Sequence, residues 1–175
     1  GYYHRDAANK DAFTEDGFFR TGDAGYIKDG ELFLTDRIKD LFKTSNGKYI
    51  APQLVESLIL VDKYIDQVAV IANERKFVSA LIVPEFRLVE DWAKEHGIEF
   101  SSREDLCANP KVNKMILDRI KTLQQQLAHY EQVKRITLIP HHFSLESGEL
   151  TNTLKIRRPV VYKNYKNEID KMYEE

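Results

Sequence analysis

Two short runs rich in β-branched and aliphatic residues, 68–72 and 77–83, lie only four residues apart in the chain. Two strands joined by so short a link can pair only as antiparallel neighbours, because a parallel pair needs a much longer crossover connection. Both runs are almost continuously apolar, which predicts strands that are mostly buried. The sequence therefore predicts a small antiparallel sheet in the middle of the chain, which flanking segments must cover.

The segments around these strands carry apolar residues at helical spacing. Such stripes predict helices at 52–61, 88–93, 112–127 and 159–172. The first is expected to begin at Pro52, and the third follows Asn109-Pro110, a suitable cap and first-turn pair. One more short strand is expected at 136–139, followed by a polar loop. This order predicts an α+β fold, a small antiparallel sheet flanked by helices.

Residues 1–38 fit this unit poorly. Apolar stretches at 24–27 and 31–44 are joined through Asp29-Gly30, which predicts a β-hairpin because glycine tolerates the positive φ of a tight turn. The residues before this hairpin mix aromatic pairs with acids, Gly and Asn without a sustained period, which predicts loop and short strand. Because residues 1–38 offer little for a core of their own, we interpret them as the end of another structure.

Charge and cysteine content exclude several classes of protein. The chain has 26 Lys and Arg against 28 Asp and Glu, a formal net charge of -2, which argues against a general binder of nucleic acid or of anionic membranes. The lone Cys107 cannot form an internal disulfide, and His141-His142 lack a carboxylate at ligand spacing, so no metal site is expected. No apolar run approaches the ~20 residues that span a bilayer. We expect a cytoplasmic protein with at most peripheral membrane contact.

Four short motifs combine residues that could bind a ligand. In Thr21-Gly22-Asp23, the carboxylate could accept hydrogen bonds from a sugar diol, although such a tripeptide is more often a turn. Arg37 and Lys39 form a charged cluster that, by itself, predicts a solvated strand face. Gly47 lies in a turn and could let a ligand approach the backbone. The loop 151–158 carries Lys155, a cation suited to meet phosphate charge, yet by itself it is only a basic loop end.

The order and spacing of these motifs carry a resemblance that no single motif carries. DGFFRTGDAGYIKDGELFLTDRIKDLFKTSNGKYIAPQLVE closely resembles the junction between the large and small domains in the adenylate-forming superfamily. That superfamily comprises acyl-CoA synthetases, luciferases and the adenylation domains of peptide synthetases. Within the junction, TDRIKDLFKTSNGKYIAPQLVE is similar to the long-chain fatty acyl-CoA ligase branch. The resemblance covers essentially the whole chain.

The resemblance implies a role for each motif residue. Asp23 matches the carboxylate that holds the ribose hydroxyls of ATP and of the acyl adenylate, and Arg37 matches the arginine near the nucleotide ribose and phosphates. Lys39 falls on the hinge about which the small domain turns. Gly47 matches the backbone that lines the pantetheine tunnel. Lys155 matches the invariant lysine that stabilises the transition state of adenylation.

Two positions depart from the family pattern. Asp36 stands where many members have glycine before the arginine, and Asn152 stands where relatives commonly have proline. Aspartate at the first position fits the long-chain branch. Proline would stiffen the loop, so asparagine at position 152 affects the stiffness of the loop. It does not affect the assignment of Lys155.

The resemblance also implies a domain division and a set of ligands. Residues 1–38 would be the tail of a large AMP-binding domain, and residues 39–175 the small mobile C-terminal domain. The phosphate loop, the magnesium-binding glutamate and the acyl tunnel of the family have no match here and would lie upstream. ATP, CoA and Mg²⁺ are the implied cofactors, with the Mg²⁺ ligands in the N-terminal part. The implied partners are a fatty acid, ATP, CoA and the protein's own N-terminal domain, and the 175 residues alone are predicted to be inactive.

Two other functions stay open at this point. One is a different acyl or aryl adenylating ligase that delivers its product to another acceptor, such as a carrier protein. The other is a non-catalytic interaction module that retains the fold. Asp23 and Lys155 argue against the second, because a decayed copy is expected to lose such residues.

Overall fold

The computed structural model describes residues 1–174, except for the side chains of Thr35 and Asp36. Asp36, which stands where many family members have glycine, is therefore one of the side chains that the structure does not describe. The chain divides into two compact units, Gly1–Leu41 and Phe42–Glu175, called here the first and the second unit.

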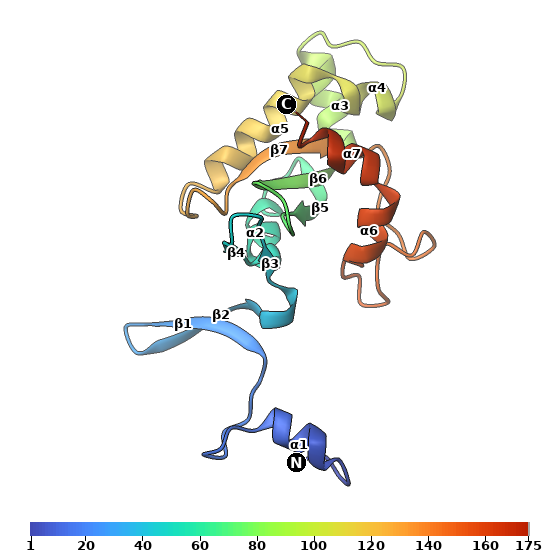
Figure 1. Cartoon of the computed structure of the whole chain (residues 1–175). Coiled ribbons are helices and arrows are strands. Elements are labelled where there is room, and N and C mark those ends of the chain that lie inside the picture. Colours follow the sequence, from blue (N-terminus) through green and yellow to red (C-terminus); the bar gives the residue numbers. More distant parts are fainter. Residues whose placement is uncertain (175) are drawn as a thin grey trace. The chain divides into compact units, whose positions relative to one another are not determined.

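The first unit is built around a two-stranded hairpin. Strands β1 (Asp23–Lys28) and β2 (Glu31–Arg37) pair antiparallel, which confirms the predicted hairpin (Figure 1). Its turn residues Asp29 and Gly30 have φ angles of 53° and 83°. Positive φ at both central residues is the turn geometry that matches the twist of hairpin strands. The Asp-Gly pair therefore sets the register beside the turn, and an irregularity between Ala24 and Gly25 shifts it by one residue, which places Asp23 opposite Arg37. A short 3₁₀ turn, η1 (Ile38–Asp40), follows.

A short helix precedes the hairpin. The prediction of loop and short strand for this part is wrong at α1 (Asp6–Ala12), which is helical. This helix buries no residue, so it has no apolar stripe for a periodicity argument to detect. Its sequence DAANKDA includes three alanines, the best helix formers, and local propensity accounts for it. A β-bridge between Phe13 and Phe19 follows.

None of the described side chains of the first unit is buried. Large apolar side chains on its hairpin stay open, with Ile27, Leu32 and Leu34 each about two-thirds exposed or more. The rings of Tyr26 and Phe33 stack on each other at 5.2 Å between centroids. The first unit therefore has no core of its own, as the sequence suggested.

The second unit contains the remaining helices and strands of the described chain. In chain order they are β3 (Phe42–Lys43), β4 (Tyr49–Ile50), α2 (Pro52–Ile59), β5 (Ile65–Ile71), β6 (Val78–Pro84), α3 (Phe86–Glu95), α4 (Arg103–Ala108), α5 (Pro110–Leu123), β7 (Val133–Leu138), α6 (Arg158–Asn164) and α7 (Lys166–Lys171). This combination of short strands and flanking helices confirms the α+β class.

The central sheet has the order β5-β6-β7. Strands β5 and β6 pair antiparallel, as predicted, and β7 joins the other side of β6 in parallel. The parallel pairing is possible because α3, α4 and α5 supply the long crossover that parallel neighbours require. All seven residues of β6 are buried, as expected of a strand with neighbours on both edges and covered faces.

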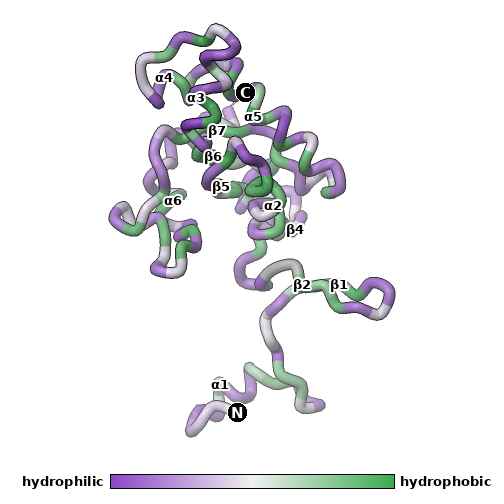
Figure 2. Tube along the Cα trace, turned by 180° about the vertical axis from the view of Figure 1, so that it is seen from behind, coloured by the Kyte–Doolittle hydropathy of each residue, from purple (hydrophilic) through white to green (hydrophobic). Residues whose placement is uncertain are grey.

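The core lies between this sheet and the helices. Helix α2 contacts β5, and α5 contacts β7; Figure 2 shows apolar stretches along α2, β5 and β6. Leu81, Ile82, Ile116 and Ile120 are completely buried, and each such side chain contributes about 1.5–3 kcal/mol when removed from water. Among the described residues, no helix combines the length and apolarity needed to cross a bilayer.

The predicted helix starts are confirmed. Helix α2 begins at Pro52, and α5 begins at Pro110 after Asn109, whose Oδ1 accepts the backbone N–H of Lys111 at 2.9 Å. Helix α4 was missed, although Ser102 caps it by accepting the N–H of Asp105. The predicted terminal helix is two helices, α6 and α7, which meet at Tyr165.

Candidate functional site

Asp23 and Arg37 lie directly opposite each other on the two strands of the hairpin. Nε of Arg37 is 3.0 Å from Oδ1 of Asp23, and the two side chains are 66% and 29% exposed. The backbone N–H of Asp23 donates to Oγ1 of Thr21 at 3.2 Å, and Ile38 N–H donates to Gly22 O at 2.8 Å. The pair offers an oriented carboxylate that can accept from hydroxyls beside a guanidinium that can donate to anionic oxygens.

Lys39 lies in the 3₁₀ turn η1, which begins directly after β2. Its side chain is exposed. Only Asp40 and Leu41 separate it from Phe42, where the second unit begins. The predicted hinge residue is therefore close in sequence to the division between the two units.

Gly47 lies in the turn between β3 and β4. Its φ is 75°, and a Cβ added there would meet no heavy atom within 4 Å. Its N–H donates to Thr44 O at 2.9 Å, and the neighbouring Ser45 N–H donates to Arg75 O at 3.0 Å. The turn is thus held by its own hydrogen bonds and by the β5–β6 connection, while the space beside Gly47 is open to an approaching ligand.

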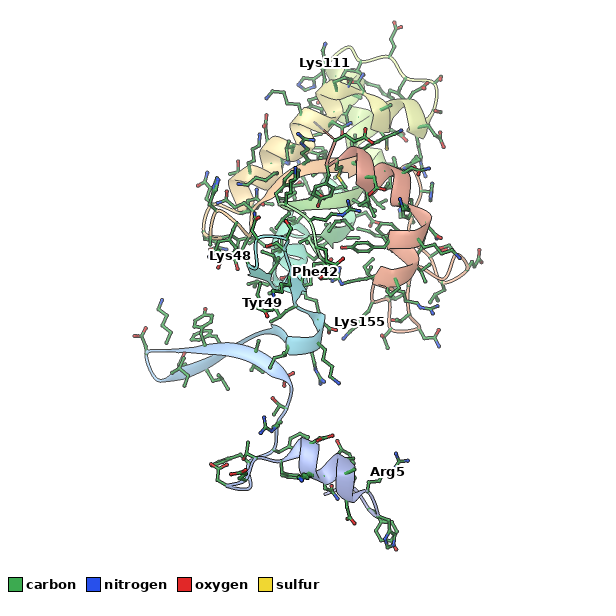
Figure 3. All side chains as sticks on the ribbon, viewed as in Figure 1. Arg5, Phe42, Lys48, Tyr49, Lys111 and Lys155 are labelled. Atoms are coloured by element: carbon green, nitrogen blue, oxygen red, sulfur yellow. The ribbon has the colours of Figure 1, made fainter. Side chains whose placement is uncertain are left out.

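Lys155 lies on a small hairpin-like loop between β7 and α6 (Figure 3). Leu150 and Ile156 form a β-bridge at its base. Thr151 N–H donates to Lys155 O at 2.8 Å, and Oγ1 of Thr151 accepts the N–H of Lys155 at 3.1 Å. Leu154 has a positive φ of 59°. The backbone around Lys155 is therefore held by hydrogen bonds, although the segment is neither helix nor strand.

The ammonium group of Lys155 is available for a ligand. Its side chain is exposed, and within residues 1–174 its Nζ forms no hydrogen bond or ion pair. A cation without a protein partner on a fixed backbone can compensate charge on a bound anion without first breaking an internal contact.

Two buried carboxylates have partners beside the ends of this loop, and the sequence did not reveal either of them. Glu56 on α2 forms an ion pair with Arg158, whose Nη1 lies 2.7 Å from Oε1. Glu149, at the base of the loop, accepts from Ser147 Oγ at 2.7 Å and from Asn164 Nδ2 at 3.0 Å. Burial alone would raise the pKa of Glu149, but these hydrogen bonds together lower the pKa below its ordinary value.

The predicted site residues fall in both units. Asp23, Arg37 and Lys39 belong to the first unit, and Gly47 and Lys155 belong to the second. The structure brings Asp23 and Arg37 into direct contact.

His141 and His142 have side-chain partners, and Cys107 is buried. His141 Nε2 lies 3.0 Å from the hydroxyl of Tyr165, and His142 Nε2 lies 3.3 Å from Asp66 Oδ2. Cys107 is buried, which raises the pKa of its thiol to about 12. Among the described residues, no three His, Cys, Asp or Glu side chains are placed so that they could hold a metal ion.

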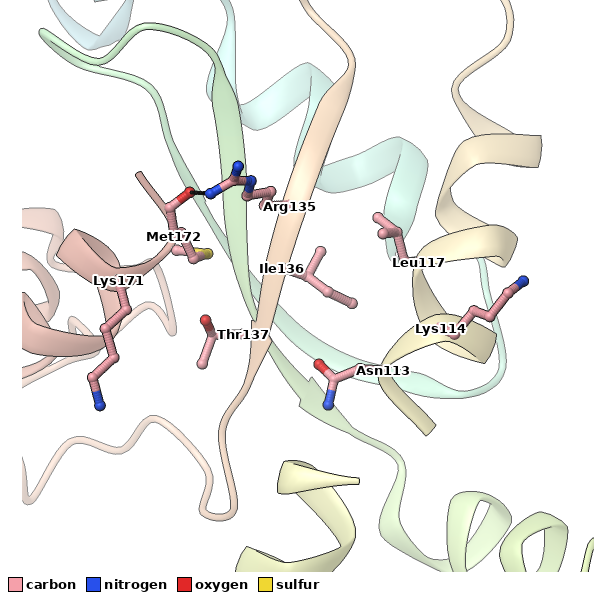
Figure 4. Close-up of a pocket in the computed structure, with 8 residues that line it drawn as sticks. All are labelled: Asn113, Lys114, Leu117, Arg135, Ile136, Thr137, Lys171 and Met172. Atoms are coloured by element: carbon pink, nitrogen blue, oxygen red, sulfur yellow. Dashed lines mark hydrogen bonds between the residues drawn. The ribbon is translucent and has the colours of Figure 1, made fainter. Parts of the chain in front are cut away.

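An open cavity of about 320 Å³ lies between α5, β7 and α7 (Figure 4). It is lined by Asn113, Lys114, Leu117, Arg135, Ile136, Thr137, Lys171 and Met172. Two of its cations already have partners, since Lys114 pairs with Asp118 and Arg135 donates to Met172 O at 2.9 Å. None of the predicted site residues lines this cavity.

Known proteins resemble the chain along its whole length. Long-chain-fatty-acid--CoA ligase 1 of Homo sapiens is 37% identical over 177 residues, which cover 99% of this chain and 25% of that protein. Long chain acyl-CoA synthetase 7, peroxisomal, of Arabidopsis thaliana is 33% identical over 179 residues, which cover 100% of this chain and 26% of that protein. The chain thus spans about a quarter of the length of these relatives.

Solved structures share the fold. The adenylation domain of the carboxylate reductase GR01_22995 from Mycobacterium chelonae superposes with a TM-score of 0.74 at 26% identity, covering 99% of this chain and 26% of that one. The Mycobacterium tuberculosis fatty acyl CoA synthetase superposes with a TM-score of 0.50 at 25% identity, covering 95% and 28%. The model of the AMP-binding enzyme C-terminal domain matches residues 39–175. The chain therefore belongs to the family of AMP-binding enzyme C-terminal domains.

Proposed function

We propose that the chain is the C-terminal portion of an ATP-dependent long-chain fatty acid:CoA ligase. In this proposal, residues 1–38 are the tail of the large AMP-binding domain, and residues 39–175 are the small mobile domain. The identity of 33–37% to long-chain acyl-CoA ligases along the whole chain supports this substrate class. The enzyme would be cytoplasmic and touch membranes only peripherally.

The observation that carries the proposal is the exposed Lys155 on its hydrogen-bonded loop. In adenylation, a fatty carboxylate oxygen attacks the α-phosphorus of ATP, and the bond from that phosphorus to the pyrophosphate oxygen breaks. Attacking group and phosphate are both anionic, so a cation beside the α-phosphate offsets the charge that develops in the transition state. Lys155 supplies that cation.

Asp23 and Arg37 would hold the nucleotide. The carboxylate of Asp23, oriented by its ion pair, accepts hydrogen bonds from the two ribose hydroxyls. The guanidinium of Arg37 donates to ribose and phosphate oxygens. Mg²⁺ would neutralise phosphate charge, and we assign its ligands to the upstream part of the enzyme, since no metal-holding cluster occurs among the described residues.

Thioester formation would use another face of the small domain. The CoA thiol attacks the acyl carbon of the adenylate, and AMP leaves. Gly47, with open space beside it, would let the pantetheine chain pass close to the backbone. The small domain would turn at Lys39 between the two half-reactions, so that Lys155 leaves the site after adenylation.

A carrier-linked adenylating enzyme is the second candidate. The likeness to the adenylation domain of a carboxylate reductase, with a TM-score of 0.74 at 26% identity, favours an adenylating enzyme other than a CoA ligase. The higher sequence identity to the acyl-CoA ligases favours CoA as the acceptor.

The test uses the parent enzyme with its large domain present, supplied with palmitate, ATP and CoA. Lys155→Ala should slow palmitoyl adenylate formation, measured by ATP–pyrophosphate exchange, by about 100-fold or more. Thioester formation from preformed palmitoyl adenylate should change less than about twofold. Lys163→Ala, which removes another exposed lysine from the same unit, is the matched control. An unchanged exchange rate in Lys155→Ala would refute the lysine assignment, and a parent enzyme inactive with palmitate would refute the substrate class.

A further inference from the structure

Arg158 and Glu56 form a two-point ion pair between α6 and α2. Nη1 of Arg158 donates to Oε1 at 2.7 Å, and Nη2 donates to Oε2 at 2.9 Å. The side chains are only 19% and 11% exposed. Oε1 also accepts the backbone N–H of Val70 on β5 at 2.9 Å. The arginine is thereby held to a helix and to the central sheet by a pair that fixes its plane as well as its position.

The same guanidinium covers the ring of Phe42, with 5.1 Å between Cζ and the ring centroid. Phe42 is 8% exposed and begins β3, the strand that leads into the turn of Gly47. A guanidinium stacked on a buried ring gains a cation–π attraction and loses freedom to move. Arg158 therefore joins α2, β5 and β3 at one point.

This point lies at one end of the Lys155 loop. The preceding residue, Arg157, donates its N–H to Glu149 O at 2.7 Å, and Ile156 bridges Leu150. The backbone that carries Lys155 is thus tied to the core within three residues of the lysine. Reacting groups must be placed to within a fraction of an ångström, and a displacement of about 1 Å can slow a reaction about 100-fold.

We propose that Arg158 and Glu56 are positioning residues for Lys155, which fix the lysine loop to the same core that carries the β3–β4 turn. This inference rests on the proposed role of Lys155 in adenylation. Arg158 does not itself contact the reactants: its guanidinium is occupied by Glu56 and Phe42.

A second ion pair provides a matched control. Nε of Arg119 on α5 donates to both carboxylate oxygens of Asp62, at 2.9 and 2.8 Å, and the Arg119 guanidinium covers the ring of Tyr64 at 4.6 Å. Asp62 is as well buried as Glu56. Arg119→Met and Arg158→Met therefore each remove an arginine–carboxylate pair and a cation–π contact. The Arg119 side chain is more exposed, 39% against 19%, and only Arg158 adjoins the Lys155 loop.

The experiment measures both half-reactions and the melting temperature of the parent enzyme and of Arg158→Met, Arg119→Met, Lys155→Ala and Lys155→Ala/Arg158→Met. We expect Arg158→Met to slow ATP–pyrophosphate exchange by about 10- to 100-fold. The thioester step should stay within about twofold of the parent, because the Gly47 turn keeps its own hydrogen bonds, from Gly47 N–H to Thr44 O and from Ser45 N–H to Arg75 O. Arg119→Met should leave exchange within about twofold, even if both variants lower the melting temperature.

The double variant should be no slower than Lys155→Ala, because Arg158 acts through the lysine. Arg158→Lys should exchange pyrophosphate little faster than Arg158→Met. Lysine restores the positive charge but cannot donate to both oxygens of Glu56 from a planar guanidinium.

Three results would overturn the inference. They are equal loss of exchange in Arg158→Met and Arg119→Met, equal loss of both half-reactions in Arg158→Met, and a double variant whose loss is the product of the two single losses. The proposed function itself fails in a different way, through a Lys155→Ala variant that exchanges pyrophosphate at the parent rate, and the positioning role then falls with it.

Discussion

Arg37 pairs with Asp23 across the β1–β2 hairpin, with Nε 3.0 Å from Oδ1. The pair joins the first residue of β1 to the last residue of β2. It therefore closes the hairpin at the end away from the Asp29-Gly30 turn and orients a carboxylate that is still partly open to solvent.

Removing the charge of Asp23 should weaken ATP binding. Asp23→Asn keeps the size of the side chain but replaces one acceptor oxygen with a donor, so it can no longer accept from both ribose hydroxyls. Hydrogen bonds to a charged group are worth about 1.5–3 kcal/mol, so the KM for ATP in the exchange assay should rise by about 10- to 100-fold. Asp29→Asn, at the turn where φ is 53°, should leave the KM unchanged, because asparagine tolerates positive φ. Equal KM values for Asp23→Asn and the parent would contradict the nucleotide role.

Gly47 and Gly97 allow backbone strain to be separated from ligand access. Their φ angles are 75° and 65°, and an added Cβ would meet no atom within 4 Å at either position. Alanine at either position should therefore lower the free energy of unfolding by about 1–2 kcal/mol, measured by urea denaturation of the chain. Only Gly47→Ala should slow thioester formation from palmitoyl adenylate in the parent enzyme. If both variants slow that step equally, the open space beside Gly47 is not used by CoA.

Glu149 should make the stability of the second unit depend on pH in the acid range. The ordinary pKa of a glutamate is 4.5. In the folded state, burial raises the pKa of Glu149, but the hydrogen bonds from Ser147 and Asn164 outweigh burial and lower the pKa below 4.5. A depressed folded pKa means that the ionised carboxylate stabilises the fold at pH values above 4.5, and that this contribution is lost as the pH falls through the folded pKa. The melting temperature of the parent chain should therefore exceed that of Glu149→Gln at pH 7, and the difference should shrink below pH 4.5. A difference that stayed constant from pH 7 to pH 3 would show that Glu149 acts by shape rather than charge.

Cys107 should resist alkylation in the folded chain. Burial raises the pKa of its thiol to about 12, and the thiolate is the reactive species. Iodoacetamide at pH 8 should modify Cys107 much more slowly in buffer than in 8 M urea, as measured by mass spectrometry. Labelling at the same rate in both solutions would mean that the region around α4 opens readily.

Local signals in the sequence were sufficient for the hairpin and the helix starts. Asp29-Gly30 requires a tight turn, while Pro52 and Asn109-Pro110 supply first-turn and capping chemistry, and each acts over a few residues. Helix α1 was missed because it buries nothing and therefore has no stripe. The parallel pairing of β7 with β6 could not be read locally, because the partners lie about 55 residues apart in the chain.

The site also contains residues that short motifs predict and residues that only the structure reveals. Asp23, Arg37, Lys39, Gly47 and Lys155 could be proposed from short motifs because their residue types and order resemble a known family. The ion pair of Glu56 and Arg158 joins residues 102 positions apart, so neither local propensity nor periodicity could reveal it. The one signal was a glutamate on α2 beside the apolar residues Val55 and Ile59, both of which are buried. A charged residue in such a place needs a partner.

The parallel β6–β7 pairing also orders events in folding. Strands β5 and β6 are adjacent in the chain and close a short loop, whereas β7 must return across α3, α4 and α5. Closing a longer loop costs more entropy, so contacts between distant segments form later than local ones. The contact between Glu56 and Arg158 spans more sequence than either strand pairing. We therefore expect the β5–β6 hairpin to pair before β7 joins it. The segment that carries Lys155 can reach its native geometry only once α2 and β5 are in place, because Arg158 at its end binds Glu56 and Val70 on those elements.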